Sequence, residues 1–383
     1  MDHYNTMTKT FLKLIQPLPI KEPLKIEKKE LAEIDAMAQR HNLKMLLYSR
    51  LQKYNKASPK NSAIADYLRK HKSLYLSNAI LSMRQEVVEK EIVSLLFAER
   101  IPSIVIKGNE IAREVYNDPN CRTSCDVDIL IKLSDALSAN SVLAAAGFFR
   151  MDKEPLAFWF SRLHQAGYLH SKTGFTIDMH WDFGIPHFFN LTSEEIWDEV
   201  DGQDCRNIKL PPDRMLILLL MHHYRHTFRD LKILTDILWT LHAYEDMIDW
   251  HLFTKRLRKI GLIKSTQITL NQIQTLWGDP AKALRCLETL RNEIQEMGYK
   301  TPAFLLSYFK MDIEKGSSHQ SARDFIVFRF ALDRWPTIIF SFLKIVFPFP
   351  RAIKALYNDR RNWTLPFNYL RFIKWRVHQW ILN

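Results

Sequence analysis

Glycine and cysteine are both scarce in this sequence of 383 residues. Only ten residues are glycine, which argues against the turn-rich all-β sandwiches and propellers. The four cysteines form no C-x-x-C pair, so the sequence predicts neither a disulfide framework nor a redox motif. We interpret Cys121 and Cys125 as structural thiols of a reduced, intracellular protein.

Long apolar runs are also missing. The first 25 residues contain no uninterrupted apolar core of the kind that a signal peptide needs. The most apolar stretch, 335–350, is interrupted by Lys344 and three prolines, and no run reaches the roughly 18 residues that cross a bilayer. The sequence therefore predicts a cytoplasmic protein without a membrane span.

The composition is that of a folded protein with an excess of positive charge. Apolar residues make up 47% and charged residues 25%, values typical of globular domains. The formal net charge of +12 indicates an anionic partner: a nucleotide, a nucleic acid or a membrane surface. We rank nucleic acid lowest, because only the charge favours it and half of that charge lies within residues 351–383.

Composition changes along the chain and divides it into four regions. Helical spacing of apolar residues fills the first region, where Leu76, Ile80, Met83 and Val87 form one row. Strand and helix signals then alternate, and helical periodicity returns afterwards. The expected regions are a helical region at 1–100, an α/β core at 101–210, a helical domain at 211–316 and a basic, aromatic helical tail at 317–383. This order predicts an α+β fold with a mixed sheet of about four or five strands.

Three acidic side chains fall on two of the expected strands. The strands are 103–106, 127–131 and 175–181, with helices expected over 109–116 and 135–146. Because side chains alternate faces along a strand, Asp126 and Asp128 share one face, and Asp178 and His180 share another. If the two strands are neighbours, three carboxylates converge and repel one another, and a divalent cation relieves that repulsion. Asp126, Asp128 and Asp178 are therefore our candidate catalytic residues and ligands of Mg²⁺, with Mn²⁺ as the alternative ion.

A glycine turn precedes these acidic residues. Lys107, Gly108 and Asn109 lie between a strand and a helix, where backbone N–H groups can approach a phosphate. Lys107 could add a point charge, and the guanidinium of Arg122 could bind two phosphate oxygens. Each of these features alone is common, but their order along the chain is not.

This order resembles the bacterial family of uncharacterised nucleotidyltransferases, within the DNA polymerase β-like nucleotidyltransferase superfamily. The residues that carry the resemblance are Lys107, Gly108, Tyr116, Arg122, Asp126, Asp128, Asp178, His180 and Trp181. The resemblance covers most of the chain and implies a nucleotidyltransferase core, three aspartate metal ligands and a triphosphate near Gly108. Asn109 stands where the superfamily usually has serine, and its amide could donate to a phosphate instead.

The helical domain supplies further candidates. His222 and His226 share a helix face, but no third zinc ligand accompanies them, so we expect these histidines and His223 to be structural or phosphate-facing. Arg225, Arg229 and Lys232 lie either on a solvated face or where the domain closes over a triphosphate. The full set of candidate nucleotide-binding residues is Lys107, Gly108, Asn109, Arg122, His180, Arg229 and Lys232.

The resemblance implies transfer of a nucleoside monophosphate from a nucleoside triphosphate to a hydroxyl of a small molecule, a sugar or a protein. The rival interpretation is a catalytically silent protein of the same fold that neutralises a toxin or assists a biosynthetic assembly. The tail is open to two interpretations, a helical pack with a basic outer face or a peripheral membrane contact.

Overall fold

The computed structural model of the chain describes most of the sequence. The described residues are 5–20, 22–58, 61–124, 126–152, 156, 160, 163–184, 188–204, 208–278, 284–314, 322–346, 350, 353–354, 357, 361 and 363–382. Cys121 and Cys286 are buried free thiols, as expected for structural cysteines. Cys125 and Cys205 lie outside the described residues.

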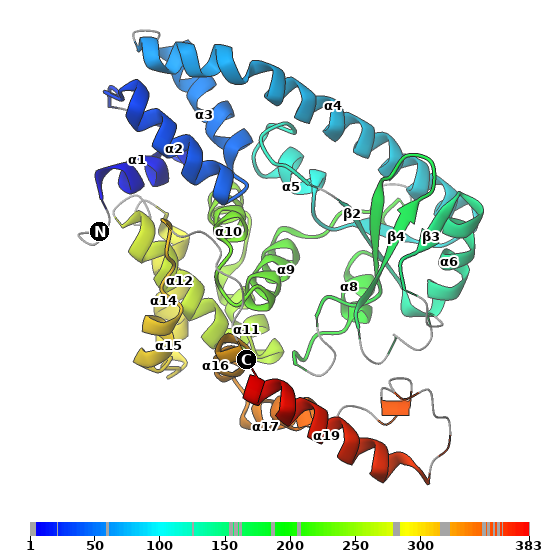
Figure 1. The fold of residues 1–383 in the computed structure, drawn as a ribbon. Coiled ribbons are helices and arrows are strands. Elements are labelled where there is room, and N and C mark those ends of the chain that lie inside the picture. Colours follow the sequence, from blue (N-terminus) through cyan, green and yellow to red (C-terminus); the bar gives the residue numbers. More distant parts are fainter. Residues whose placement is uncertain are drawn as a thin grey trace.

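Four helices precede the sheet. They are α1 (Thr6–Ile15), α2 (Lys28–Arg40), α3 (Lys44–Ala57) and α4 (Ser62–Ala98). Asn61 caps α4 by accepting a hydrogen bond from the N–H of Ile64. The long α4 starts beside α3 and ends near the sheet (Figure 1). The apolar row that contains Met83 and Val87 is exposed on α4, whereas Ile92 and Leu96 are buried.

A five-stranded mixed sheet forms the centre of the α/β core, which confirms the predicted fold class. Its strands are β1 (Ser103–Val105), β2 (Asp126–Ile131), β3 (Phe148–Arg150), β4 (Gln165–His170) and β5 (Thr176–His180). The spatial order is β1-β2-β5-β4-β3, with β2 and β5 parallel and every other pair antiparallel. The expected strands 103–106, 127–131 and 175–181 correspond to β1, β2 and β5, whereas β3 and β4 escaped prediction.

Each face of the sheet packs against a different apolar core. Ile129 and Ile177 belong to a cluster with Ile92 and Leu96 of α4 and with Leu143 of α6 (Ala136–Ala145). The opposite face belongs to the main core of the molecule. Figure 1 shows the sheet between α6 on one side and α9 on the other. Short connecting elements complete this region: α5 (Asn109–Glu114), η1 (Leu133–Asp135) and α8 (Ser193–Glu199).

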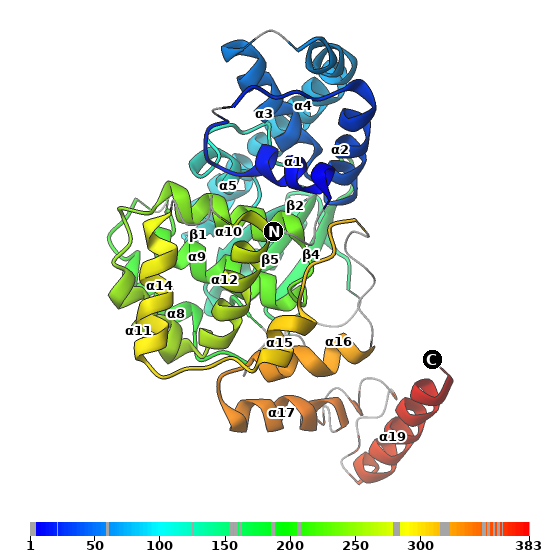
Figure 2. The same cartoon turned by 90° about the vertical axis from the view of Figure 1, so that its left-hand side faces the viewer.

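The second helical region packs on the first. Its helices are α9 (Pro212–Arg225), α10 (Leu231–Ala243), α11 (Trp250–Ile260), α12 (Ile263–Trp277), α14 (Arg285–Glu296) and α15 (Ala303–Tyr308). The indole N–H of Trp239 donates to the carbonyl of Ile15 at 2.8 Å, and that of Trp277 donates to the carbonyl of Leu12 at 3.0 Å. Both tryptophans and the residues of α1 belong to one core, so the two helical regions are joined (Figure 2).

The helical periodicity over 213–241 belongs to two helices instead of one. Thr227 and Phe228 have positive φ angles of 52° and 57°, which interrupt the helix after α9. Asp230 then accepts hydrogen bonds from the N–H groups of Lys232 and Ile233, which starts α10. This turn directs α10 back along α9, and both helices face the sheet side that carries the acidic residues.

The tail contributes α16 (Ala322–Val327), η2 (Phe328–Ala331), α17 (Trp335–Val346) and α19 (Leu365–Leu382). Phe328, Leu332 and Ile338 join a small aromatic core with Tyr224 and Phe309, so the first part of the tail is attached to the body. Among the residues that the structure describes, none of the helices combines the length and apolar character needed to span a bilayer.

The core that backs the sheet allows a matched test of packing on α6. Leu143 is buried in this core, whereas Leu137 on the same helix is 56% exposed. Leu143→Ala should lower the free energy of unfolding by about 2–5 kcal/mol, because it leaves a cavity. Leu137→Ala should change it by less than about 0.5 kcal/mol, and equal losses in urea unfolding would contradict the assigned packing.

Candidate active site

Pairing of β2 with β5 brings two aspartates side by side. In the parallel register, Asp128 lies opposite Asp178, and Asp126 lies opposite Thr176. The strands are therefore neighbours, as the sequence analysis required. Among the described residues, one ligand atom each from Asp128, Asp178 and His180 lies within 4.8 Å of the others. The register thus gives a compact group of two carboxylates and one imidazole at the centre of the sheet.

Asp128 is the most buried of the three acidic residues and has two donors. The Nζ of Lys107 lies 2.8 Å from its Oδ1, and the Nε2–H of His180 donates to the same oxygen at 2.9 Å. Burial opposes the charge on this carboxylate, but Lys107 and His180 together hold its pKa well below the usual range. Burial lowers the pKa of His180 to about 4, so the imidazole is neutral and orients Asp128.

The surroundings of Asp126 and Asp178 raise the pKa values of these carboxyls, in contrast to those of Asp128. Burial, together with the charges of Asp128 and Asp126, raises the pKa of Asp178 to about 6. Burial and Asp128 also raise the pKa of Asp126. The side-chain amide of Gln165 donates to Asp178, which is the one side-chain donor recorded for it in the described residues. Neighbouring buried carboxylates that raise one another's pKa favour a bound divalent ion.

Gly108 has a conformation that other residues rarely adopt. Its φ is 61° and its ψ is −121°, and a Cβ at this position would lie 3.2 Å from the Oγ of Ser124. The same Cβ would lie 3.5 Å from the carbonyl oxygen of Asp126, so the turn passes close to the start of β2. Asn109 begins α5 and is buried, with its amide 3.4 Å from the carbonyl of Ser82. Because α5 has only six residues, its dipole at this turn is weak.

Arg122 is bonded to protein groups. Its Nε and Nη2 donate to the carboxylate of Asp236 at 3.0–3.1 Å, and its Nη1 donates to the carbonyl of Gly108 at 3.1 Å. The hydroxyl of Tyr116 donates to the same Asp236 at 2.7 Å. We expected Arg122 to bind phosphate; in the structure its guanidinium joins the glycine turn to Asp236 of α10.

The two other expected cations also have protein partners. The guanidinium of Arg229 donates to Asp324 at 2.8 Å, which ties the turn between α9 and α10 to the tail. The Nζ of Lys232 donates to the carbonyl of Thr123 at 2.6 Å. The charge of Lys232 nevertheless acts on the carboxylates, because it partly opposes the rise in the pKa of Asp126. Arg229 is directed toward the tail.

One face of α9 lies over the carboxylates. The charge of Arg225 interacts with Asp178 and Asp128, and its Nη1 donates to His164 Nε2 at 2.6 Å. His222 is close enough to Lys107 and Asp128 to interact with both charges, and its ring meets that of His226 edge-on, with the ring centroids 4.6 Å apart. His223 points elsewhere and bonds to Gln272. The i, i+3, i+4 spacing of residues 222, 225 and 226 places them on one helix face, which is the sequence pattern that identifies this side of the site. No sequence pattern identified His164 or Gln165 as residues near the carboxylates.

The donor set fits a hard divalent cation. Carboxylate oxygens from Asp128 and Asp178 are the ligand type that Mg²⁺ and Mn²⁺ prefer. Asp126, at the start of β2, is not part of the compact group that Asp128, Asp178 and His180 form. His180 is already engaged with Asp128, so it supports a ligand and is not needed as one. Trp181 lies in the core on the other face of the sheet, with its indole N–H donating to the carbonyl of Leu163.

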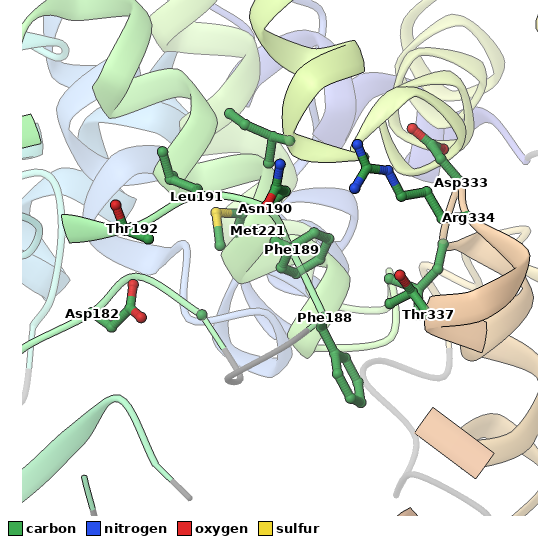
Figure 3. Close-up of a pocket in the computed structure, with 14 residues that line it drawn as sticks. Asp182, Phe188, Phe189, Asn190, Leu191, Thr192, Met221, Asp333, Arg334 and Thr337 are labelled. Carbon is green, nitrogen blue, oxygen red and sulfur yellow. The ribbon is translucent and has the colours of Figure 1, made fainter. Parts of the chain in front are cut away.

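A cavity of about 450 Å³ opens beyond the end of β5. Asp182 lines one side, and Arg334 and Thr337 line the other (Figure 3). Aromatic and polar groups from Phe189 and Asn190 complete part of the wall. Met221, which directly precedes His222 on α9, also lines it, so α9 borders both this cavity and the carboxylate group. Burial raises the pKa of Asp182 to about 6.

A mixed α+β fold with aspartates on neighbouring strands is consistent with a nucleotidyltransferase. The family model described as "Uncharacterised nucleotidyltransferase" matches residues 27–278, and the chain belongs to that family. The match covers the first helical region from α2 onward, the sheet and the helices through α12. No curated protein matches the chain.

The buried Arg122–Asp236 pair should contribute strongly to stability. Asp236→Ala would leave the Arg122 guanidinium buried without a counter-ion, and we expect a loss of about 3–5 kcal/mol in the free energy of unfolding. The matched control is Asp246→Ala, which removes an exposed pair with Arg285 and should cost less than about 1 kcal/mol. Similar urea midpoints for the two variants would show that the network is not structurally important.

The carboxylate group should bind Mn²⁺ in a pH-dependent way. With Mn²⁺ at a hundredfold excess over its Kd, binding adds about 2.7 kcal/mol, or a few degrees in Tm. The Tm increase should be present at pH 7.5 and much smaller at pH 5, because Asp178 is protonated below its pKa of about 6. Thermal unfolding with and without Mn²⁺ measures this. Asp178→Asn should abolish the increase at both pH values, and an unchanged increase would remove Asp178 from the site.

Proposed function

We propose that this protein is a Mg²⁺-dependent nucleotidyltransferase that moves a nucleoside monophosphate from a nucleoside triphosphate to a hydroxyl acceptor. The family membership supports a transferase at the coarse level. The single observation that carries the finer proposal is the register of β2 with β5, which sets Asp128 against Asp178. Because a purely structural pair of strands gains nothing from two facing carboxylates, this arrangement favours a cation-dependent role.

Asp126, Asp128 and Asp178 would hold Mg²⁺ or Mn²⁺ in this proposal. When bound, the ion supplies neutralisation of the triphosphate charge and activation of the acceptor hydroxyl. In the balanced reaction, the acceptor oxygen forms a bond to the α-phosphorus, the bond to the pyrophosphate oxygen breaks, and the hydroxyl proton is released. Positioning and charge stabilisation account for most of the catalysis in such reactions.

The residues around the carboxylates have distinct roles in this proposal. Lys107 and Gly108 would contact the triphosphate at the glycine turn, as would Asn109. His180 orients Asp128, which keeps one carboxylate oxygen in a fixed place. Arg225 and His222 on α9 would face the triphosphate from the opposite side, because both interact electrostatically with the aspartates.

The cavity beyond β5 is the place that we propose for the acceptor. It lies just beyond the end of β5 and is bordered by Met221 of α9, and it offers both an acidic and a basic side chain, Asp182 and Arg334. A polar acceptor with an apolar part suits walls that combine these charges with Phe189 and Met221.

One observation favours the rival, a catalytically silent binding protein. Lys107 and His180 already compensate the charge of Asp128 without any metal, so a closed, unreactive site is electrostatically stable. In such a protein the nucleotide would bind, or the partner would bind, without turnover. The carboxylates of Asp126 and Asp178 remain uncompensated by comparable contacts, which is why we prefer the enzyme.

Transfer should depend on Asp178. The purified protein is incubated with each of the four α-³²P-labelled nucleoside triphosphates, Mg²⁺ or Mn²⁺, and host lysate, and label transferred to any acceptor is measured. Asp178→Asn should reduce transfer by about 100-fold or more, because it removes a charge that acts only at the reacting centre. Asp201→Asn, an exposed change in the same region, should leave transfer unchanged.

The same assay separates the enzyme from its rival. Label transferred by the wild-type protein and lost in Asp178→Asn supports the transferase. Binding of a labelled nucleotide without transfer, unchanged in Asp178→Asn, would support the silent protein. Circular dichroism of each variant distinguishes a lost activity from a lost fold.

A further inference from the structure

Helix α17 has one face attached to the body and one face exposed. Ile338 and Ser341 are buried, and Ile338 belongs to the aromatic core of the tail. Trp335, Ile339 and Leu343 follow at every fourth residue on another side, and each is at least half exposed. Large apolar side chains arranged in one row at a surface are costly in water and indicate a contact with something apolar.

Helix α19 has the same division. Asn368 and Phe372 are buried on its inner side. Trp363 lies just before the helix, and Phe367 and Leu370 lie one and two turns further on. Each of these three side chains is more than 60% exposed. Two separate helices of the tail therefore each present an aromatic and aliphatic row to solvent, and we call these six residues the tail apolar face.

The charge around the tail apolar face is predominantly positive. Residues 334–383 contain nine arginines and lysines but a single acidic residue, Asp359. Arg334 adjoins Trp335, and Arg371 and Lys374 lie exposed on α19 close to Leu370. Exposed tryptophan and phenylalanine flanked by arginine and lysine are typical of helices that lie in the interface of an anionic bilayer.

The position of the two helices agrees with such a contact. Both views show α17 and α19 at the same end of the molecule, beyond α16 and away from the first helical region (Figures 1 and 2). Both helices therefore lie where a surface can approach them from outside the body. A basic surface with an apolar centre is complementary to anionic headgroups above acyl chains, whereas it would repel a second copy of the same basic surface.

We propose that the tail apolar face docks this protein on the surface of an anionic lipid bilayer. The apolar side chains of α17 and α19 enter the boundary between headgroups and acyl chains. Arg371 and Lys374 contact the lipid phosphates. The contact is peripheral, since it involves helix faces and not a spanning segment, and it does not depend on the transferase activity.

Vesicle sedimentation with the full chain tests this docking. The probes are vesicles of phosphatidylcholine alone and vesicles of phosphatidylcholine mixed with phosphatidylglycerol. We expect the protein to sediment with the mixed vesicles at low salt, to bind at least about tenfold more weakly to phosphatidylcholine alone, and to be released by high salt. The double variant Ile339→Asp/Phe367→Asp should lose at least about tenfold in binding to the mixed vesicles.

A matched control comes from α4, whose apolar row is equally exposed but far from the tail. Met83 and Val87 have exposures of 65% and 64%, similar to those of Ile339 and Phe367, so Met83→Asp/Val87→Asp should leave binding unchanged. Absence of wild-type binding to mixed vesicles, or equal loss in both double variants, overturns the proposal. A wild-type dimer that becomes a monomer in Ile339→Asp/Phe367→Asp, measured by analytical ultracentrifugation, also overturns it, because the face would then pair two copies.

Discussion

The parallel pairing of β2 with β5 is the constraint on which the candidate site depends. A shift of one residue would turn Asp128 or Asp178 into the apolar core behind the sheet, since side chains alternate faces. The observed register is held by apolar residues such as Ile129 and Ile177, which fill that core. Burial of these neighbours therefore fixes the aspartates together despite their mutual repulsion, and the repulsion in turn creates the demand for a cation.

A second interaction links this sheet to the rest of the chain. Asp236 of α10 receives both Arg122 and Tyr116, and Arg122 also holds the carbonyl of Gly108. Movement of α10 would thus move the glycine turn, which lies against the start of β2. A residue that a motif suggests for substrate binding can instead position the groups that bind the substrate. Such a positioning residue can matter for activity as much as a residue that binds the substrate directly.

The fold class and the facing aspartates Asp128 and Asp178 could be predicted from the sequence, because both depend on local patterns. Alternating apolar and acidic residues identified β2 and β5, while β4 lacks a β-branched run and its Gln165 carried no signal. The partner of Arg122 lies 114 residues away, so no spacing rule could connect it to Asp236. Likewise, the periodicity across 213–241 gave the helices but not the turn at Thr227, which directs α10 toward the sheet.

Helix α17 connects the two parts of the molecule for which we propose functions. Its start contributes Arg334 and Thr337 to the cavity beyond β5, while Trp335 and Ile339 belong to the tail apolar face. One helix therefore borders the proposed acceptor cavity with one side and the proposed bilayer contact with another. If both proposals hold, the cavity lies next to the membrane surface, and amphipathic acceptors present in that surface would reach it without crossing bulk water. This geometry gives the basic charge of the tail a role that a purely aqueous acceptor would not require.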